Sequence, residues 1–169
     1  MRPLILIPAL LLTASAAYAQ SSGAGDPPAT SNSAASAAQS AAEPQWGPVP
    51  SALPAGAQIV VLQGNPFGNG VYTLRLKMPN GYTVPPHFHP TDEMVTVISG
   101  TLQIGMGDQI DKTTAKTLKA GGFATAAAGM HHYAVARGEA IVQVHGQGPF
   151  AITYVNAKDD PRAVGNRNR

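Results

Sequence analysis

Cysteine is absent from the 169 residues, so the chain has no disulfide bond and no thiolate to serve as ligand or nucleophile. Charge is also scarce, because Asp, Glu, Lys and Arg make up 12% of the chain and the formal net charge is +2. So small a balance excludes the basic surface of a nucleic-acid-binding protein and a polybasic membrane anchor. A domain without disulfides depends on its hydrophobic core, which a domain of about 110 residues can supply.

No hydrophobic run is long enough for a transmembrane helix. The run from Leu4 to Leu12 falls well short of the ~20 residues that span a bilayer, so no stable membrane span is expected. Arg2 precedes this run and Ala17-Tyr18-Ala19 follows it, which is the layout of a secretory signal peptide. We therefore predict a signal peptide over residues 1–19, cleavage after Ala19, and a periplasmic or secreted protein.

Composition divides the rest of the chain into three parts. Residues 20–56 are mostly Ala, Ser, Gly and Pro, which bury too little apolar surface to offset their ordering entropy, so a disordered low-complexity linker is expected. Residues 57–157 contain short segments rich in β-branched and aromatic side chains and form the predicted folded domain. Residues 158–169 are polar, and we expect a loose tail.

The folded part has the pattern of an all-β protein. Between residues 71 and 78, Tyr72, Leu74, Leu76 and Met78 alternate with polar side chains, which is the period of a half-buried strand. Many short strands separated by Gly and Pro are typical of a β-sandwich or barrel. The strands predicted in this way cover residues 58–62, 71–78, 93–99, 101–106, 117–118, 123–126, 132–136, 140–145 and 150–155.

Three ligand-type residues lie close together before the third of these strands. His87 and His89 are two residues apart, so on an extended chain both imidazoles leave the same face. Glu93 follows at the start of the next strand. Neutral imidazole and carboxylate together suit a divalent transition metal ion, such as Mn, Fe, Ni, Cu or Zn. A His-x-His pair alone occurs as readily on a protein surface or in a turn, so the residues around it decide whether it is a metal site.

That pattern resembles the cupin superfamily. The segment from Gly81 to Gly100 fits the first cupin motif at every defined position: Gly, five residues, His-x-His, three residues, Glu, six residues, Gly. The segment from Gly121 to His132 fits most of the second motif, although Ala127 stands where proline is usual and Ala136 where asparagine is frequent. The resemblance covers residues 58–156 and implies a single cupin barrel, the jelly-roll or double-stranded β-helix fold.

The resemblance also implies a complete ligand set. In it His87, His89 and Glu93 bind one metal ion from the first motif, and His132 completes the site from the second. Such a set leaves one or two positions for water, oxygen or substrate, as a reactive site requires. His131 competes with its neighbour, but adjacent residues on a strand face opposite ways, and the motif spacing favours His132.

Several polar and bulky residues have two interpretations each. His145 and Gln143 share a face of a late strand, where one of them could orient a metal ligand. We favour a polar group at the barrel mouth or on the opposite face of the sheet. Five bulky side chains either line a substrate pocket or contribute to ordinary packing: Tyr72, Phe88, Met94, Met106 and Met130.

Two functions remain open at this point. The first is a mononuclear metal-dependent dioxygenase or decarboxylase that acts on a small organic substrate, with Glu93 as ligand and candidate catalytic base. The second is a non-catalytic cupin that holds a metal or a small ligand. Both predict a small-molecule partner and no nucleic acid. Cupins often form dimers, and the segment Gln58 to Leu62 is a candidate strand for a homodimer contact.

Overall fold

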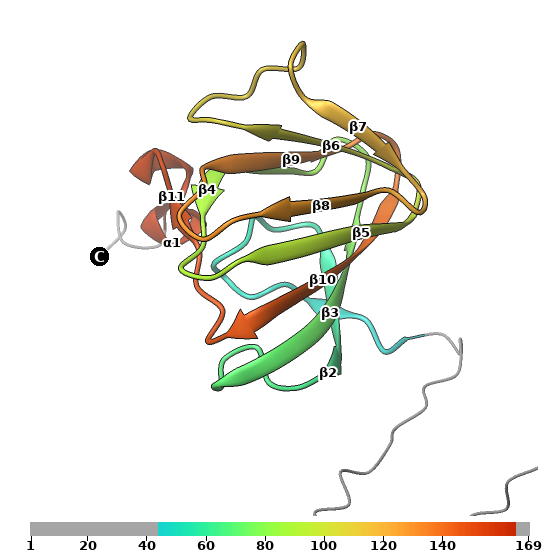
Figure 1. Cartoon of the computed structure of the whole chain (residues 1–169), viewed down its shortest axis with the longest axis vertical. Helices are drawn as coiled ribbons and strands as arrows, with labels where there is room; N and C mark the ends of the chain where they lie inside the picture. Colours follow the sequence, from blue (N-terminus) through green and yellow to red (C-terminus); the bar gives the residue numbers. More distant parts are fainter. Residues whose placement is uncertain (1–43, 165–169) are drawn as a thin grey trace, which may run out of the picture. The chain divides into compact units, whose positions relative to one another are not determined.

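The computed structural model describes residues 44–164, and these residues form a two-sheet β-barrel (Figure 1). The predicted signal peptide over residues 1–19, its cleavage site after Ala19 and the first part of the predicted linker lie outside the described residues, as does the end of the predicted tail. Among residues 44–164, no helix is long and apolar enough to cross a membrane.

Every strand pairs with its neighbours in antiparallel fashion. The larger sheet has the order β1-β2-β3-β10-β5-β8, and the smaller sheet has the order β11-β4-β9-β6-β7. The larger sheet contains β1 (Gly47–Pro48), β2 (Gln58–Gln63), β3 (Gly70–Met78), β10 (Ala140–Gly148), β5 (Glu93–Ser99) and β8 (Phe123–Ala126). The smaller sheet contains β11 (Thr153–Tyr154), β4 (Thr83–Phe88), β9 (His132–Ala136), β6 (Thr101–Met106) and β7 (Lys116–Lys119).

The hydrophobic core lies between the two sheets. On β3 the predicted alternation is confirmed, because Tyr72, Leu74, Leu76 and Met78 are all buried while the residues between them are half-buried. Their neighbours on β10 alternate in the same register, with Val142 opposite Leu76. Side chains that point inward from both sheets therefore enclose one interior, and apolar burial of this kind supplies most of the folding free energy.

One side chain on the outer face of the smaller sheet is shielded from solvent. Tyr133 on β9 points away from the interior, yet it is fully buried and its hydroxyl donates to the carbonyl of Asp111. Gly105 lies directly opposite on β6, and a Cβ there would overlap the tyrosine ring. Glycine at residue 105 thus leaves room for the Tyr133 ring to lie across β6.

The folded region begins earlier than the sequence predicted. The predicted linker extends to residue 56, but β1 already pairs with β2, and Leu53 is buried in the core. Two tyrosine hydroxyls hold the same segment, since Tyr82 donates to the carbonyl of Pro54 and Tyr154 donates to that of Ala52. The sequence did not predict that this segment is folded, because it is rich in proline and alanine and the residues that anchor it lie in distant strands.

The predicted loose tail at residue 158 is likewise wrong within the described residues. A 3-10 helix, η1 (Ala157–Asp159), and one helical turn, α1 (Pro161–Val164), follow β11. Arg162 links this end to the barrel, because its guanidinium donates to the carbonyl of Ile152 and to the carboxylate of Asp160. The hydrogen bond from Arg162 to a single backbone carbonyl produces no repeating pattern in the sequence, so the sequence alone could not predict that this end is ordered.

Candidate metal centre

The two histidines of the first motif come from a strand that proline interrupts. Pro85 and Pro86 lack the backbone N–H that would continue the ladder, and the register between β4 and β9 shifts between Val84 and His87. Pairing resumes at His87, which lies opposite His132 on β9. The shift therefore places these two imidazoles side by side inside the barrel, with their ring centroids 4.2 Å apart.

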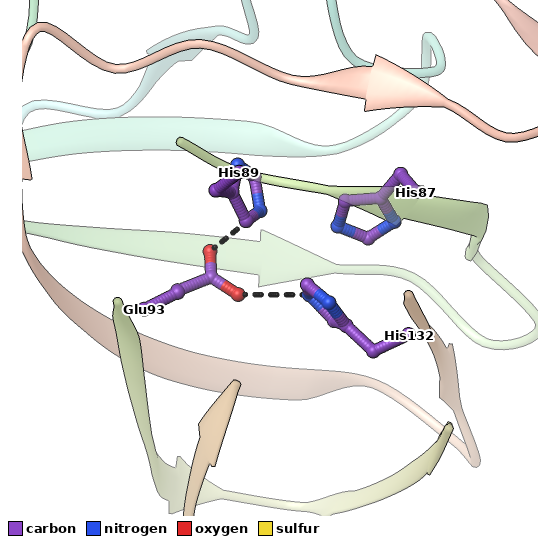
Figure 2. A group of neighbouring side chains, drawn as sticks. All are labelled: His87, His89, Glu93 and His132. Carbon is purple, nitrogen blue, oxygen red and sulfur yellow. Dashed lines mark hydrogen bonds and ion pairs between the residues drawn. The ribbon is translucent and has the colours of Figure 1, made fainter. Parts of the chain in front are cut away.

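His89 and Glu93 complete the group from either side of the bend between β4 and β5. Figure 2 shows the carboxylate of Glu93 directed at His89 and His132. Its Oε2 lies 3.2 Å from Nε2 of His132, and its Oε1 lies 3.5 Å from Nε2 of His89. The candidate ligand atoms of all four residues lie within 4.8 Å of one another. Two ligands about 2.1 Å from one ion lie roughly 3.0–3.4 Å apart at angles of 90–109°, so the two Glu93 contacts have the spacing of a shared ion, whereas the most distant atoms of the group would draw together when an ion binds.

Each histidine is oriented by a backbone carbonyl. Nδ1 of His87 donates to the carbonyl of Pro85 at 2.7 Å, and Nδ1 of His132 donates to that of Met130 at 3.0 Å. His89 donates in the same way to the carbonyl of Ala151 at 2.7 Å. With Nδ1 committed to a carbonyl, His87 and His89 direct Nε2 into the interior, whereas Nε2 of His132 donates a second hydrogen bond to Glu93 and would lose that proton when a metal ion binds. This is how proteins hold imidazole for metal binding.

One of these Nε2 atoms has no hydrogen-bond partner. Nε2 of His89 is buried and unsatisfied, and it is the sole such side-chain atom among residues 44–164. Buried polar atoms in native proteins are paired in the great majority of cases, so an unpaired lone pair aimed at a carboxylate and two other imidazoles indicates an absent partner. The donor set and this orphaned nitrogen fit a divalent metal ion.

The electrostatics of the four residues are those of a strongly coupled group. Burial, together with the neighbouring His132 and His89, lowers the pKa of His87 to about 3, so this ring stays neutral. Burial alone would raise the pKa of Glu93, but the hydrogen bond with His132 and the nearby imidazoles outweigh it and lower that pKa. Burial likewise disfavours charge on His132, yet the hydrogen bond to Glu93 raises its pKa. One carboxylate thus faces at least one neutral, metal-competent imidazole.

The four side chains open onto a cavity of about 300 Å³ in the barrel interior. Inward-facing aliphatic side chains of both sheets form most of its wall. The five bulky residues that the sequence left open do not line it: Tyr72, Phe88, Met94, Met106 and Met130. Of these, Tyr72 is buried nearby; burial and the charge of Glu93 raise its pKa to about 12.

The remaining histidines lie outside this group. His131 lies just before β9 and faces outward, stacked on Phe88 and paired with Asp108, as alternation predicted. His145 is half-buried on the outer face of β10, where it shares hydrogen bonds with Thr73 and Gln143. The favoured interpretation of His145 and Gln143 as polar residues on the opposite sheet face is therefore confirmed.

The carbonyls that orient the rings were not recognised in the sequence. Pro85 and Met130 each precede their histidine by two residues, so the local spacing could have indicated them. Ala151 lies 62 residues from His89, and only the return of the chain to β11 brings it there. No local pattern carries that contact.

The protein is an antiparallel two-sheet β-barrel in which three histidines and a glutamate face the interior and form a candidate metal site. The cupin domain family matches residues 74–146, which contain all four candidate ligands. These residues form a cupin domain, as the two motifs predicted.

Solved structures with similar folds were found, whereas no curated protein sequence matches significantly. A cupin superfamily protein from Desulfitobacterium hafniense is 14% identical with a TM-score of 0.47, covering 54% of this chain and 77% of its own. KdgF from Halomonas sp. is 18% identical with a TM-score of 0.48, covering 61% and 86%. An oxalate oxidase is 23% identical with a TM-score of 0.48, covering 63% and 59%.

Proposed function

We propose that this cupin binds one divalent transition metal ion through Nε2 of His87, His89 and His132 and the carboxylate of Glu93. The observation that carries the proposal is the buried, unpaired Nε2 of His89, held by a backbone carbonyl and directed at the other three side chains. Imidazole and carboxylate without thiolate favour Mn, Fe, Ni, Cu or Zn. Metal ligands must be deprotonated, and the lowered pKa values of His87 and Glu93 meet that requirement, while His132, whose pKa Glu93 raises, would release a proton as the ion binds.

We propose further that the cavity beside the site receives a small organic molecule, and that the protein is a dioxygenase or a decarboxylase. The contiguous cavity supports turnover, because an ion that only stabilises a fold is closed off by its ligands. A bound ion would supply Lewis-acid and electron-transfer chemistry. Glu93 is the one carboxylate that lines the cavity among the described residues, so it is the candidate to accept a proton from the bound molecule. A cupin that binds without turnover is the alternative.

Two measurements test these proposals in sequence. Elemental analysis of the protein from its native host should find about one divalent transition metal per chain, and a His87→Ala, His132→Ala double variant should lose it. Metal-loaded protein is then assayed for oxygen uptake and carbon dioxide release with phenolic, thiol and dicarboxylic compounds. Tight metal retention without either gas signal would favour the non-catalytic alternative. A metal-free native protein would refute both.

We also propose that the protein acts in the periplasm or the medium. The support is the basic, apolar and small-residue layout of residues 1–19. N-terminal sequencing of the protein recovered from its native host should begin at Gln20. Recovery of the uncleaved chain from the cell interior would contradict this localisation.

A further inference from the structure

The wall of the cavity has no polar side chain other than the four candidate ligands. Every other described residue that lines it is aliphatic, aromatic, proline or methionine, and the wall includes Leu74, Met78, Val95, Val142 and Val144. No Arg, Lys, Asn, Gln, Ser, Thr or Tyr side chain reaches it among the described residues. Recognition of a sugar or of a second carboxylate needs such groups, because a buried polar atom without a partner is costly.

The exposed end of the cavity is apolar as well. Of the lining residues, Pro48, Val61 and Phe67 are the exposed ones, and they come from β1, β2 and the loop that follows β2. Phe67 has 67% of its surface exposed and Val61 has 44%. Exposed apolar side chains that gather at the rim of a pocket mark a surface that meets an apolar molecule.

Charge balance limits the polar part of the ligand to one group. A divalent ion together with ionised Glu93 and neutral histidines carries one net positive charge, which a single anionic donor would neutralise. A further charged group elsewhere in the cavity would find only hydrocarbon and would lose its hydration without a partner. The ligand therefore has one metal-binding head and an uncharged body.

The cavity volume sets the size of that body. A dry apolar cavity of about 150 Å³ is sufficient to bind benzene. The cavity here is about 300 Å³, which is twice as large. It therefore accommodates a molecule of about ten to fifteen non-hydrogen atoms, such as one aromatic ring with a short alkyl chain.

We propose that the ligand of this cupin is a small apolar molecule with a single anionic or neutral donor group, such as an alkylphenol. The inference rests on the proposed metal site for the donor group, but the apolar wall and entrance are independent of the metal. Compounds with two or more charged groups, including sugar acids and extended dicarboxylates, are excluded as ligands of the cavity.

Isothermal titration of zinc-loaded protein with matched phenols tests the inference, because zinc is redox-inert and leaves the probe intact. From phenol to 4-propylphenol, affinity should rise about fourfold for each added carbon, since each buried methylene contributes about 0.8 kcal/mol. The probe 3-(4-hydroxyphenyl)propane-1-sulfonate has the same head and a similar length but a charged sulfonate tail that is a poor zinc ligand, and it should bind more than about tenfold more weakly than 4-propylphenol. Equal or tighter binding of the charged phenol would overturn the inference.

A charge at the entrance sharpens the test. Val61→Lys places an ammonium at the exposed end of the cavity, so it should weaken binding of 4-propylphenol and tighten binding of 3-(4-hydroxyphenyl)propane-1-sulfonate. Gln63→Lys adds the same charge at an exposed residue of β2 that does not line the cavity, and it should change neither affinity. If both variants behave alike, the entrance has been assigned wrongly and the inference fails.

Metal-free protein separates this inference from the metal proposal. Toluene has no donor group, and its binding to metal-free protein, followed by NMR line broadening, should persist even if the metal site proves wrong. Toluene binding without any zinc binding would refute the metal site and support the apolar cavity. Zinc binding without toluene or alkylphenol binding would refute the cavity inference and leave the metal proposal standing.

Discussion

The inner and outer faces of the barrel both carry histidine, but they hold the imidazole in different ways. On the inner face, His87, His89 and His132 are almost fully buried, each donates Nδ1–H to a backbone carbonyl, and each directs Nε2 at the same point. On the outer face, His131 and His145 bond to polar side chains beside solvent. A backbone carbonyl holds an imidazole in one orientation, whereas a side-chain partner can move with the ring. The face of the strand therefore separates a candidate metal ligand from a surface histidine.

The largest contrast lies between two adjacent residues, His132 and His131. His132→Ala removes a proposed ligand, and zinc affinity should fall by more than 100-fold, because loss of a group that merely orients a ligand already costs about 10–100-fold. His131→Ala changes an outer-face residue and should leave zinc stoichiometry and affinity unchanged. Isothermal titration with zinc measures both variants. Similar losses in the two would show that β9 is assigned to the wrong register.

This contrast was predictable from the sequence, and so was much of the barrel. Strand alternation places His131 and His132 on opposite faces, and the predicted bounds of β5, β6, β8 and β9 are confirmed. The alternation is clear there because glycines end the strands sharply. Each of these assignments depends on residues close together in the chain.

The parts that could not be predicted depend on distant contacts. Proline conceals β1 and β4, since it lacks the N–H that a strand normally offers. The predicted last strand over residues 150–155 shrinks to β11, and the carbonyl of Ala151 just before it orients His89 instead. The apolar wall of the cavity also joins residues from both sheets, so only the fold brings it together.

Glu93 offers a second comparison, with its neighbour Asp92. Glu93→Gln removes the one negative charge of the inner face and should weaken zinc binding by about 10–100-fold while the barrel still folds, because the amide retains an acceptor oxygen. Asp92 is exposed and accepts a hydrogen bond from the backbone N–H of Ala128. Asp92→Asn retains that acceptor too and should bind zinc as the parent protein does. Comparable losses would indicate a general effect of charge rather than ligation.

The inner face should also make the metal-free protein sensitive to acid. The pKa of His87 falls from 6.5 in the unfolded chain to about 3 in the folded one, so between these values the unfolded chain binds a proton that the folded protein refuses. Stability therefore decreases as the pH falls through this window, with a slope of up to about 1.4 kcal/mol per pH unit. The raised pKa of His132 gives stability that is fully present below 6.5, so it does not oppose this slope.

Urea unfolding of the chelator-treated protein between pH 5 and 6.5 measures the slope, in a range that lies above the usual titration of Glu93. His87→Asn replaces the ring with a smaller group that does not titrate. It should therefore reduce the slope of stability against pH by up to about 1.4 kcal/mol per pH unit, even if the variant is less stable throughout. An unchanged slope in the variant would assign the acid sensitivity to another group.

The smallest effect is expected on the outer face at His145. His145→Ala removes hydrogen bonds to Thr73 at 2.9 Å and to Gln143 at 3.0 Å, both on half-buried side chains that water can reach. The loss should be about 0.5–1.5 kcal/mol in the free energy of unfolding, the range of a partly solvated hydrogen bond and a cross-strand pair. Zinc affinity should not change, because the ring points away from the interior. A measurable loss of zinc affinity would mean that a change on the outer face of β10 alters the metal site. Burial would then not be enough to separate the histidines that bind metal from those that do not.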